Sequence, residues 1–178
     1  EPTVATIRQC LGTLVFGEGD DELQDAVLRL LRRKQETLAT AEWGTAGLVA
    51  DWLGNAGEAP GHFVGGVVVA SESALERLLE VPGELIAQHT PTSAEVAQAM
   101  AAGCRRRFGA DYGLAVSRFP RFDPTATAPE PMFVALAHEA GVEVKAFPFT
   151  GHPALLRVFS AKRALNLVRL TMLEGSEE

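Results

Sequence analysis

The spacing of apolar and polar residues along the chain predicts amphipathic helices that alternate with short buried strands. A first helix is predicted after Asp20 or Asp21, because a short side-chain oxygen can cap its first turn. A later helix is predicted to start at a Thr-x-x-Glu capping box formed by Thr92 and Glu95, and to stop at Gly109. Further helices are predicted over 45–53, from Ser71 through Leu79, and from Pro153 to about Leu173. Apolar runs predict strands at 37–42, 63–70, 111–117, 131–138 and 142–149.

This order of elements predicts an α/β fold in which helices cover both faces of one sheet. The length of 178 residues suits a single domain with short appendages. We divide the chain into a connecting segment at 1–19, the domain itself at 20–173 and a frayed tail at 174–178. Because the chain opens with Glu1 rather than methionine, we expect it to be cut from a longer protein, with 1–19 joining a preceding domain.

The charge balance and the length of the apolar runs argue against two classes of partner. The formal net charge is −7 and the pI is near 5.2, so the chain lacks the basic surplus typical of nucleic-acid binding. The one basic run, 105–107, ends a predicted helix, where positive charge favours the helix dipole; contact with a phosphate or an acid is the alternative. No apolar run reaches the roughly 20 residues of a membrane-spanning helix, so no membrane association is predicted.

Cysteines and histidines are few and lie far apart in the sequence. Cys10 and Cys104 belong to no paired motif, which favours a reduced, cytoplasmic protein. No two histidines have the spacing that would direct both imidazoles at one metal, so we predict neither a metal site nor a cofactor. The histidines are His62, His89, His138 and His152.

Two places are predicted to carry a binding site. In α/β sheets, binding sites lie at the carboxyl ends of strands, where loops and helix starts follow. They are the turn 42–47 and the loop after Val116. Free amides at the helix start after Glu42 would form a cradle for an anion. Small residues at such a turn also serve simple close packing, and the pattern alone leaves both interpretations open.

The run Ala41–Leu48, A-E-W-G-T-A-G-L, resembles the A-E-S-C-T-G-G-L signature of the CinA C-terminal domain family of competence/damage-inducible proteins, also called nicotinamide-nucleotide amidases. The resemblance continues in order over about residues 14–170. It implies a three-layer α/β/α sandwich with a central mixed sheet, and a homodimer. The other matching segments are 14–18, 65–75, 85–93, 107–117 and 149–165.

The family removes the amide of nicotinamide mononucleotide, and the resemblance implies a nucleophilic serine activated by a tyrosine and a lysine. At these three positions the chain carries Trp43, Ala70 and Leu75. A serine hydroxyl attacks an amide carbon only when a neighbouring base takes its proton, and none of the three replacements can supply either group. No catalytic residue of the family is therefore intact.

A vestigial pocket is nevertheless predicted. Its residues either match the family's residues or lie beside the position of the family's active site. The family's glycine-rich phosphate loop has become bulky over 117–124, which would fill space that glycines leave open. The pocket residues that we predict are Glu42, Trp43, Thr45, Gly47, Gly65, Gly66, Ser117, Arg118 and Arg157.

Three hypotheses follow. The first is a catalytically inactive CinA-like domain with an assembly or regulatory role. The second is a remodelled module that binds a nucleotide-like or other small ligand, with Trp43, Phe119 and Phe122 as an aromatic floor and Arg118, Arg121 or Arg157 meeting an acid group. Its alternative is that these aromatics fill the old pocket as core. The third is an enzyme, either one with new chemistry built from Glu42, Ser117 and a histidine, or a hydrolase that retains amidase activity through an unrecognised site.

Overall fold

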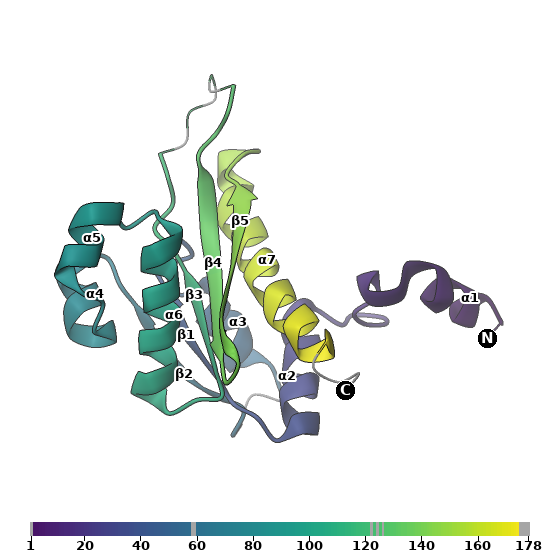
Figure 1. Ribbon diagram of the computed structural model, residues 1–178. Coiled ribbons are helices and arrows are strands. Elements are labelled where there is room, and N and C mark those ends of the chain that lie inside the picture. Colours follow the sequence, from purple (N-terminus) through teal and green to yellow (C-terminus); the bar gives the residue numbers. More distant parts are fainter. Residues whose placement is uncertain (1, 58–59, 122, 124, 126, 175–178) are drawn as a thin grey trace.

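Five strands form one mixed sheet in the computed structural model, which describes residues 2–57, 60–121, 123, 125 and 127–174 (Figure 1). The sheet order is β2-β1-β3-β4-β5. Strand β1 runs parallel to β2 and β3, whereas β4 is antiparallel to both β3 and β5. The strands are β1 Leu38–Glu42, β2 Phe63–Val68, β3 Tyr112–Val116, β4 Pro131–His138 and β5 Gly141–Pro148.

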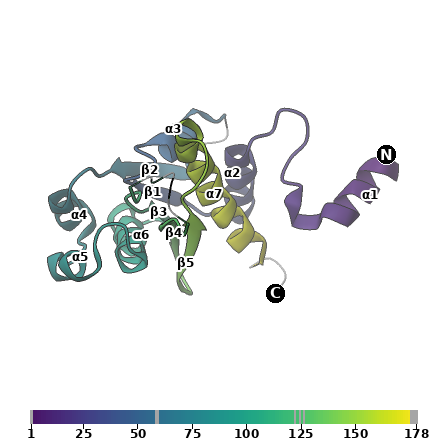
Figure 2. The same ribbon diagram turned by 90° about the horizontal axis from the view of Figure 1, so that it is seen from above.

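Helices cover both faces of this sheet, which confirms the predicted three-layer α/β/α arrangement (Figure 2). One layer holds α2 Leu23–Lys34, α3 Leu48–Asn55 and α7 Pro153–Glu174. The opposite layer holds α4 Glu72–Leu79, α5 Gly83–His89 and α6 Ala94–Phe108. Helix α1 Pro2–Leu11 and the short 3-10 turn Gly12–Leu14 project from the body (Figure 1). No helix in the described part of the chain is both long and apolar enough to cross a membrane.

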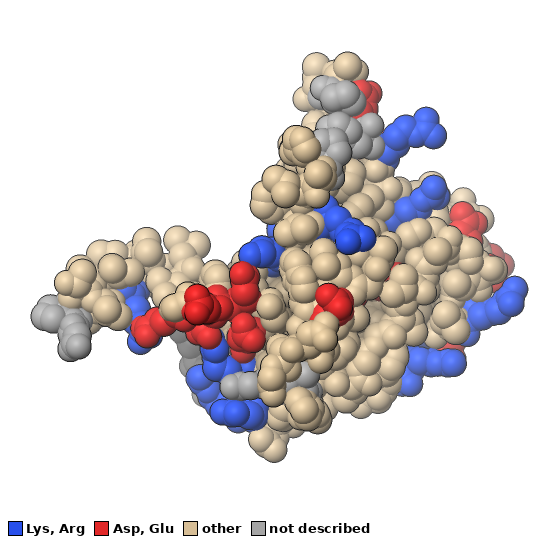
Figure 3. Space-filling view, turned by 180° about the vertical axis from the view of Figure 1, so that it is seen from behind, with Lys and Arg blue, Asp and Glu red and all other residues tan. Residues whose placement is uncertain are grey.

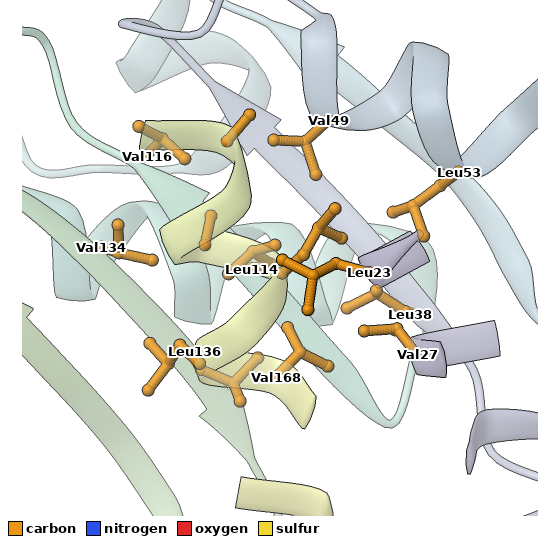
Figure 4. Close-up of a cluster of buried hydrophobic side chains, with 14 of the residues drawn as sticks. Leu23, Val27, Leu38, Val49, Leu53, Leu114, Val116, Val134, Leu136 and Val168 are labelled. Atoms are coloured by element: carbon orange, nitrogen blue, oxygen red, sulfur yellow. The ribbon is translucent and has the colours of Figure 1, made fainter. Parts of the chain in front are cut away.

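The two faces of the sheet carry side chains of different size. Toward α2, α3 and α7 the strands present leucine and valine, among them Leu38, Leu114, Val134 and Leu136 (Figure 4). Toward α6 the same strands present alanines, and these are Ala39, Ala41, Ala115, Ala135 and Ala137. The small side chains let α6 approach the sheet closely, while the larger ones fill the space under α2 and α7.

Two glycines mark how tightly α6 is packed. A Cβ added at Gly103 of α6 would overlap the carbonyl oxygen of Leu79 and lie 2.9 Å from its carbonyl carbon. A Cβ added at Gly113 of β3 would overlap the carbonyl oxygen of Ala101 and lie 2.7 Å from the Arg105 amide nitrogen. Close backbone approach therefore requires glycine at both positions.

Two predicted helix starts were wrong in detail. The N-cap of α2 is Glu22, whose amide donates to the Asp25 carboxylate at 2.9 Å in a capping box. Asp21, predicted as a cap, instead accepts two 2.9 Å bonds from Arg29. The N-cap of α6 is Ser93, which accepts from the Val96 amide at 3.2 Å, rather than Thr92.

Other boundaries agree with the prediction or shift by a few residues. Ser71 caps α4 by accepting from the Ala74 amide, and Gly109 ends α6 in the left-handed region, with φ of 61°. Helix α3 begins at Leu48 rather than at 45, because Ala46 and Gly47 have positive φ and form a turn. Helix α1 was not predicted within the segment 1–19. The tail predicted to fray lies, from residue 175 onward, outside the described residues.

Candidate functional site

The end of β1 and the turn that follows it hold the first group of predicted site residues. The Trp43 amide donates to the Val116 carbonyl and the Gly44 amide donates to the Ser117 carbonyl, both at 3.1 Å. The backbone at the end of β1 thus stays tied to β3 beyond the last paired residues. This places Trp43 at the carboxyl end of two adjacent parallel strands, where sites of α/β sheets are found.

Glu42 fills the anion cradle that was predicted for a ligand. Its carboxylate is 1% exposed and accepts hydrogen bonds from the Thr45 hydroxyl at 2.6 Å, the Val49 amide at 3.0 Å and the Ala50 amide at 2.8 Å. The carboxylate thereby neutralises the positive end of α3. These amides are occupied by the chain itself, so Glu42 and Thr45 hold the strand–helix turn together.

Trp43 lines an open hollow of about 410 Å³ next to this turn. The guanidinium carbon of Arg118 lies 5.6 Å from the centroid of the half-buried Trp43 ring, within the range of a cation–π contact. The other lining residues are Ala70, Ser71 and Glu72, which join the end of β2 to α4. The structure therefore brings Trp43, Ala70 and Arg118 together at one hollow.

Leu75 is completely buried in the apolar cluster between the sheet and α4, α5 and α6. The half-buried Trp43 ring packs against the same cluster. Trp43, Ala70 and Leu75 thus lie near one another, where the first two line the hollow and Leu75 belongs to the adjoining core. None of these three side chains can bind or release a proton in catalysis.

The structure adds Ser71 and Glu72 to the predicted pocket. The Ser71 hydroxyl caps α4 and lies 3.2 Å from the Ser73 hydroxyl, so its neighbours are an amide and another hydroxyl rather than a base. The sequence carried a signal for both residues, because they lie inside the segment 65–75 that matches the family. Sequence reasoning treated Ser71 only as a helix cap.

Phe119 does not form an aromatic floor with Trp43. Its ring packs against Gly44, where an added Cβ would overlap it, and against Phe149, with ring centroids 4.7 Å apart. It belongs to the core beneath α2, α3 and α7 rather than to the cluster against which Trp43 packs. Phe122 lies outside the described residues, and Arg121 lines a different hollow of about 310 Å³.

The remaining predicted pocket residues have structural roles or lie elsewhere. Ser117 is buried, donates to the Arg118 carbonyl and accepts from the Phe133 amide, both at 3.1 Å, which ties β3 to β4. A Cβ at Gly65 would lie 3.1 Å from the Phe108 ring, and one at Gly66 would overlap the Thr40 hydroxyl. In the described part of the chain, the lining of the 410 Å³ hollow does not include Gly47 or the exposed Arg157.

The histidines make separate local contacts. His62 Nδ1 lies 3.0 Å from the Glu36 carbonyl, His89 lies 3.6 Å from Glu95, and His138 stacks near Tyr112 with ring centroids 6.3 Å apart. Within the described ranges, no group of histidine, cysteine and acidic residues could hold a metal ion.

Comparisons with known proteins agree on one family. Residues 20–172 match the family model described as the CinA C-terminal domain. A CinA-like protein of Geobacter sulfurreducens is 38% identical over 173 residues, which is 94% of this chain and 41% of that protein. A CinA-like protein of Frankia casuarinae is 35% identical over 98% of this chain and 40% of its own length. The chain therefore spans about two fifths of the curated relatives that it matches.

Solved structures give the same result at the level of the fold. A CinA superfamily protein of Klebsiella pneumoniae has a TM-score of 0.79 at 25% identity, covering 88% of this chain and 99% of its own. The competence damage-inducible protein A of another Klebsiella pneumoniae strain has a TM-score of 0.78 at 27% identity, with 85% and 95% covered.

Proposed function

The chain belongs to the CinA C-terminal domain family, and we propose that it is a catalytically inactive member with an assembly or regulatory role. The observation that carries this proposal is the set of side chains at the family's catalytic positions. Trp43, Ala70 and Leu75 stand where the resemblance places the nucleophilic serine and its activating tyrosine and lysine. Their convergence at one hollow and its adjoining core supports this assignment of positions.

The chemistry of amide cleavage explains why these replacements are decisive. Attack on the amide carbon needs a nucleophile whose proton is taken by a base, and the resulting oxyanion needs hydrogen-bond donors. The amides of Val49 and Ala50, in the first turn of α3, are bound to Glu42 and are not free to serve as such donors. Loss of a single triad member lowers kcat by roughly 10⁴–10⁶ in serine hydrolases, and loss of all three costs about as much as the most harmful single loss, so the family's reaction should fall by a factor of that size.

The test is an ammonia-release assay with nicotinamide mononucleotide, run beside a catalytically active relative. We expect no ammonia above the no-enzyme background from the purified chain. Turnover at a rate similar to that of the active relative would overturn the proposal. In that case, ammonia release that survives Trp43→Ala but is lost in Ser71→Ala would identify Ser71 as the nucleophile of an unrecognised site, in place of the set of Glu42, Ser117 and a histidine.

A second candidate function is a remodelled binding module, and the open 410 Å³ hollow favours it. The Trp43 ring and the Arg118 guanidinium offer a flat ligand a stacking surface and a charge for an acid group. A ligand present at one hundred times its Kd would raise the Tm of a domain of this size by roughly 5–10 °C.

Thermal shift measured with nicotinamide mononucleotide, AMP and GMP tests this second candidate. Binding in the hollow predicts a shift that is lost in Arg118→Ala and kept in Arg121→Ala, because Arg121 lines the other hollow. An unchanged Tm with all three nucleotides would eliminate nucleotide binding at this place.

A further inference from the structure

A groove of about 530 Å³ lies between α7, the start of α2 and the segment that precedes α2. We call it the α7 groove, and its apolar lining residues are Leu14, Phe16, Leu23 and Phe159. Leu14 is 74% exposed and Phe159 is 47% exposed. Large apolar side chains that gather at an exposed groove commonly mark a place where a ligand or partner binds. The α7 groove shares none of its described lining residues with the hollow beside Trp43.

The polar lining of the α7 groove is positively charged. It consists of Lys162, Arg163, Asn166 and Arg169, all on α7. With Phe159 these residues recur at helical spacing, so one face of α7 forms this wall of the groove. None of the described lining residues is acidic. The groove therefore combines an apolar surface with a basic wall, and this combination is complementary to an anion that carries an apolar body.

Arg169 is the most deeply buried cation of this wall, and only 4% of it is exposed. Its Nη2 atom donates to the Thr13 carbonyl at 2.6 Å and to the Asn166 amide oxygen at 2.8 Å. Its Nε atom donates to the same amide oxygen at 3.0 Å. Both acceptors are neutral, and the two N–H groups of Nη1 make no hydrogen bond to the described residues. Nη1 is not sealed from its surroundings, so these two donors are available to a ligand.

No carboxylate of the described residues pairs with Arg169. Acidic side chains gather where the projecting N-terminal segment meets the body (Figure 3), but those that form ion pairs there do so with other cations. The pairs are Arg8–Glu18, Arg29–Asp21 and Lys162–Glu22. Burial lowers the pKa of Arg169, and no neighbouring acid opposes this effect. Because a buried charge is costly unless it is paired, an anion in the α7 groove would compensate Arg169.

We propose that the α7 groove binds a small amphiphilic carboxylic acid, whose carboxylate meets Arg169 and whose apolar body lies against Phe16 and Phe159. Hydrogen bonds from a guanidinium to a carboxylate are charge-assisted and match the geometry of both groups. The volume of the groove lies in the range of small-molecule sites, roughly 300–1,000 Å³. A single buried cation also favours a ligand with a single acid group. This site is separate from the amidase chemistry and from the hollow beside Trp43.

Calorimetric titration of the whole chain with decanoate, kept below the concentration at which it forms micelles, tests the proposal. We expect one decanoate to bind per chain. Decanol lacks the charge and decyltrimethylammonium reverses it, so neither can accept charge-assisted hydrogen bonds from Arg169. Both should bind at least about tenfold more weakly than decanoate. Vesicles that contain an acidic phospholipid serve as a further probe, because a membrane surface offers acid groups and apolar chains without a free small ligand.

Substitutions on α7 locate the binding. Phe159→Ala should weaken decanoate binding at least about fivefold, because it removes apolar surface from the groove. The matched control is Leu155→Ala, at a residue of α7 that is 45% exposed and outside the groove lining, and it should leave the Kd unchanged. Arg169→Gln should abolish binding, and circular dichroism checks that this variant folds, since Arg169 also holds Thr13. Arg118→Ala, in the other hollow, should leave decanoate binding intact.

Three results would each overturn the proposal. The first is no binding of decanoate at up to about 1 mM, whether or not the acidic vesicles bind. The second is equal binding of decanoate and decanol, which would exclude a role for the buried cation. The third is binding that Phe159→Ala leaves unchanged, which would place the ligand outside the α7 groove even if Arg169→Gln fails to fold. None of these results bears on the amidase assay.

Discussion

The Thr45 hydroxyl donates a 2.6 Å hydrogen bond to the Glu42 carboxylate, and both side chains are buried where β1 turns into α3. The same carboxylate holds the Val49 and Ala50 amides. The three hydrogen-bond partners of this buried carboxylate are all donors. Glu42 therefore acts as a structural cap, although its position beside Trp43 made it a candidate for a ligand site.

Glu42→Gln should lower the free energy of unfolding by about 2–4 kcal/mol. The NH₂ group of glutamine would replace one carboxylate oxygen and face a hydrogen-bond donor, and the negative charge at the start of α3 would be lost. Urea denaturation followed by circular dichroism measures this change. Glu139→Gln, at an exposed residue between β4 and β5, is the control and should change it by less than about 0.5 kcal/mol. Equal stabilities of the two variants would contradict the capping role.

Gly103→Ala should destabilise the fold by at least about 2 kcal/mol. In an exposed helix this substitution stabilises by about 1 kcal/mol, so the expected sign is reversed by the overlap with the Leu79 carbonyl. The shift of the urea midpoint measures it. Gly57→Ala, where an added Cβ meets nothing within 4 Å, should be close to neutral. A stabilised Gly103→Ala variant would show that α6 lies farther from α4 than described.

Alkaline titration of Tyr112 should report its burial. Burial, followed by the neighbouring Glu36 carboxylate that its hydroxyl contacts at 3.1 Å, raises the pKa of Tyr112 from 10.0 to about 12. Because the folded-state pKa exceeds the unfolded one, the associated stability is complete below pH 10 and is lost as the pH rises through about 12.

Tyr112 is the chain's single tyrosine, so absorbance at 295 nm follows this group alone. The midpoint should lie near pH 12 in the native protein and near pH 10 in concentrated urea. Glu36→Gln should lower the native pKa of Tyr112 by removing the carboxylate charge. A native midpoint near pH 10 would contradict the buried placement of the ring.

The two thiols should differ sharply in reactivity. Cys10 is exposed on α1, whereas burial raises the pKa of the Cys104 thiol to about 12. At pH 8 a disulfide reagent such as Ellman's reagent should therefore titrate one thiol rapidly in the native chain and both after unfolding. Cys10→Ser should leave the native protein unreactive. Rapid labelling of Cys104 in that variant would indicate that α6 detaches from the sheet.

The strands and the order of layers could be read from the sequence because they depend on local patterns. Apolar runs such as 38–42 are strands buried on both faces, and Ser71 and Gly109 mark helix ends by chemistry that acts within a few residues. The N-cap of α2 was missed because the Glu22 cap depends on a reciprocal bond with Asp25 rather than on residue type alone.

The interior of the candidate site was harder to predict because it depends on contacts between distant segments. Nothing local to Phe119 shows that its ring turns toward Gly44 and Phe149, away from Trp43. Residues near Glu42 do not show whether its carboxylate faces a ligand or the chain itself. That depends on the start of α3 at Leu48, which directs two amides toward the carboxylate. Trp43, Ala70 and Arg118 were singled out from the sequence and do line one hollow, but packing decides that Glu42, Thr45 and Ser117 do not.

The unequal faces of the sheet bear on how this domain can change over evolutionary time. Where alanine and glycine allow α6 to pack closely on the strands, a larger side chain would overlap its neighbours. Substitutions on that side of the sheet should therefore be tolerated poorly. Beneath α2 and α7, leucines and valines can exchange volume among themselves, and compensating substitutions should accumulate there. Divergent members can therefore drift in one half of the interior while the half that carries the hollow keeps its shape.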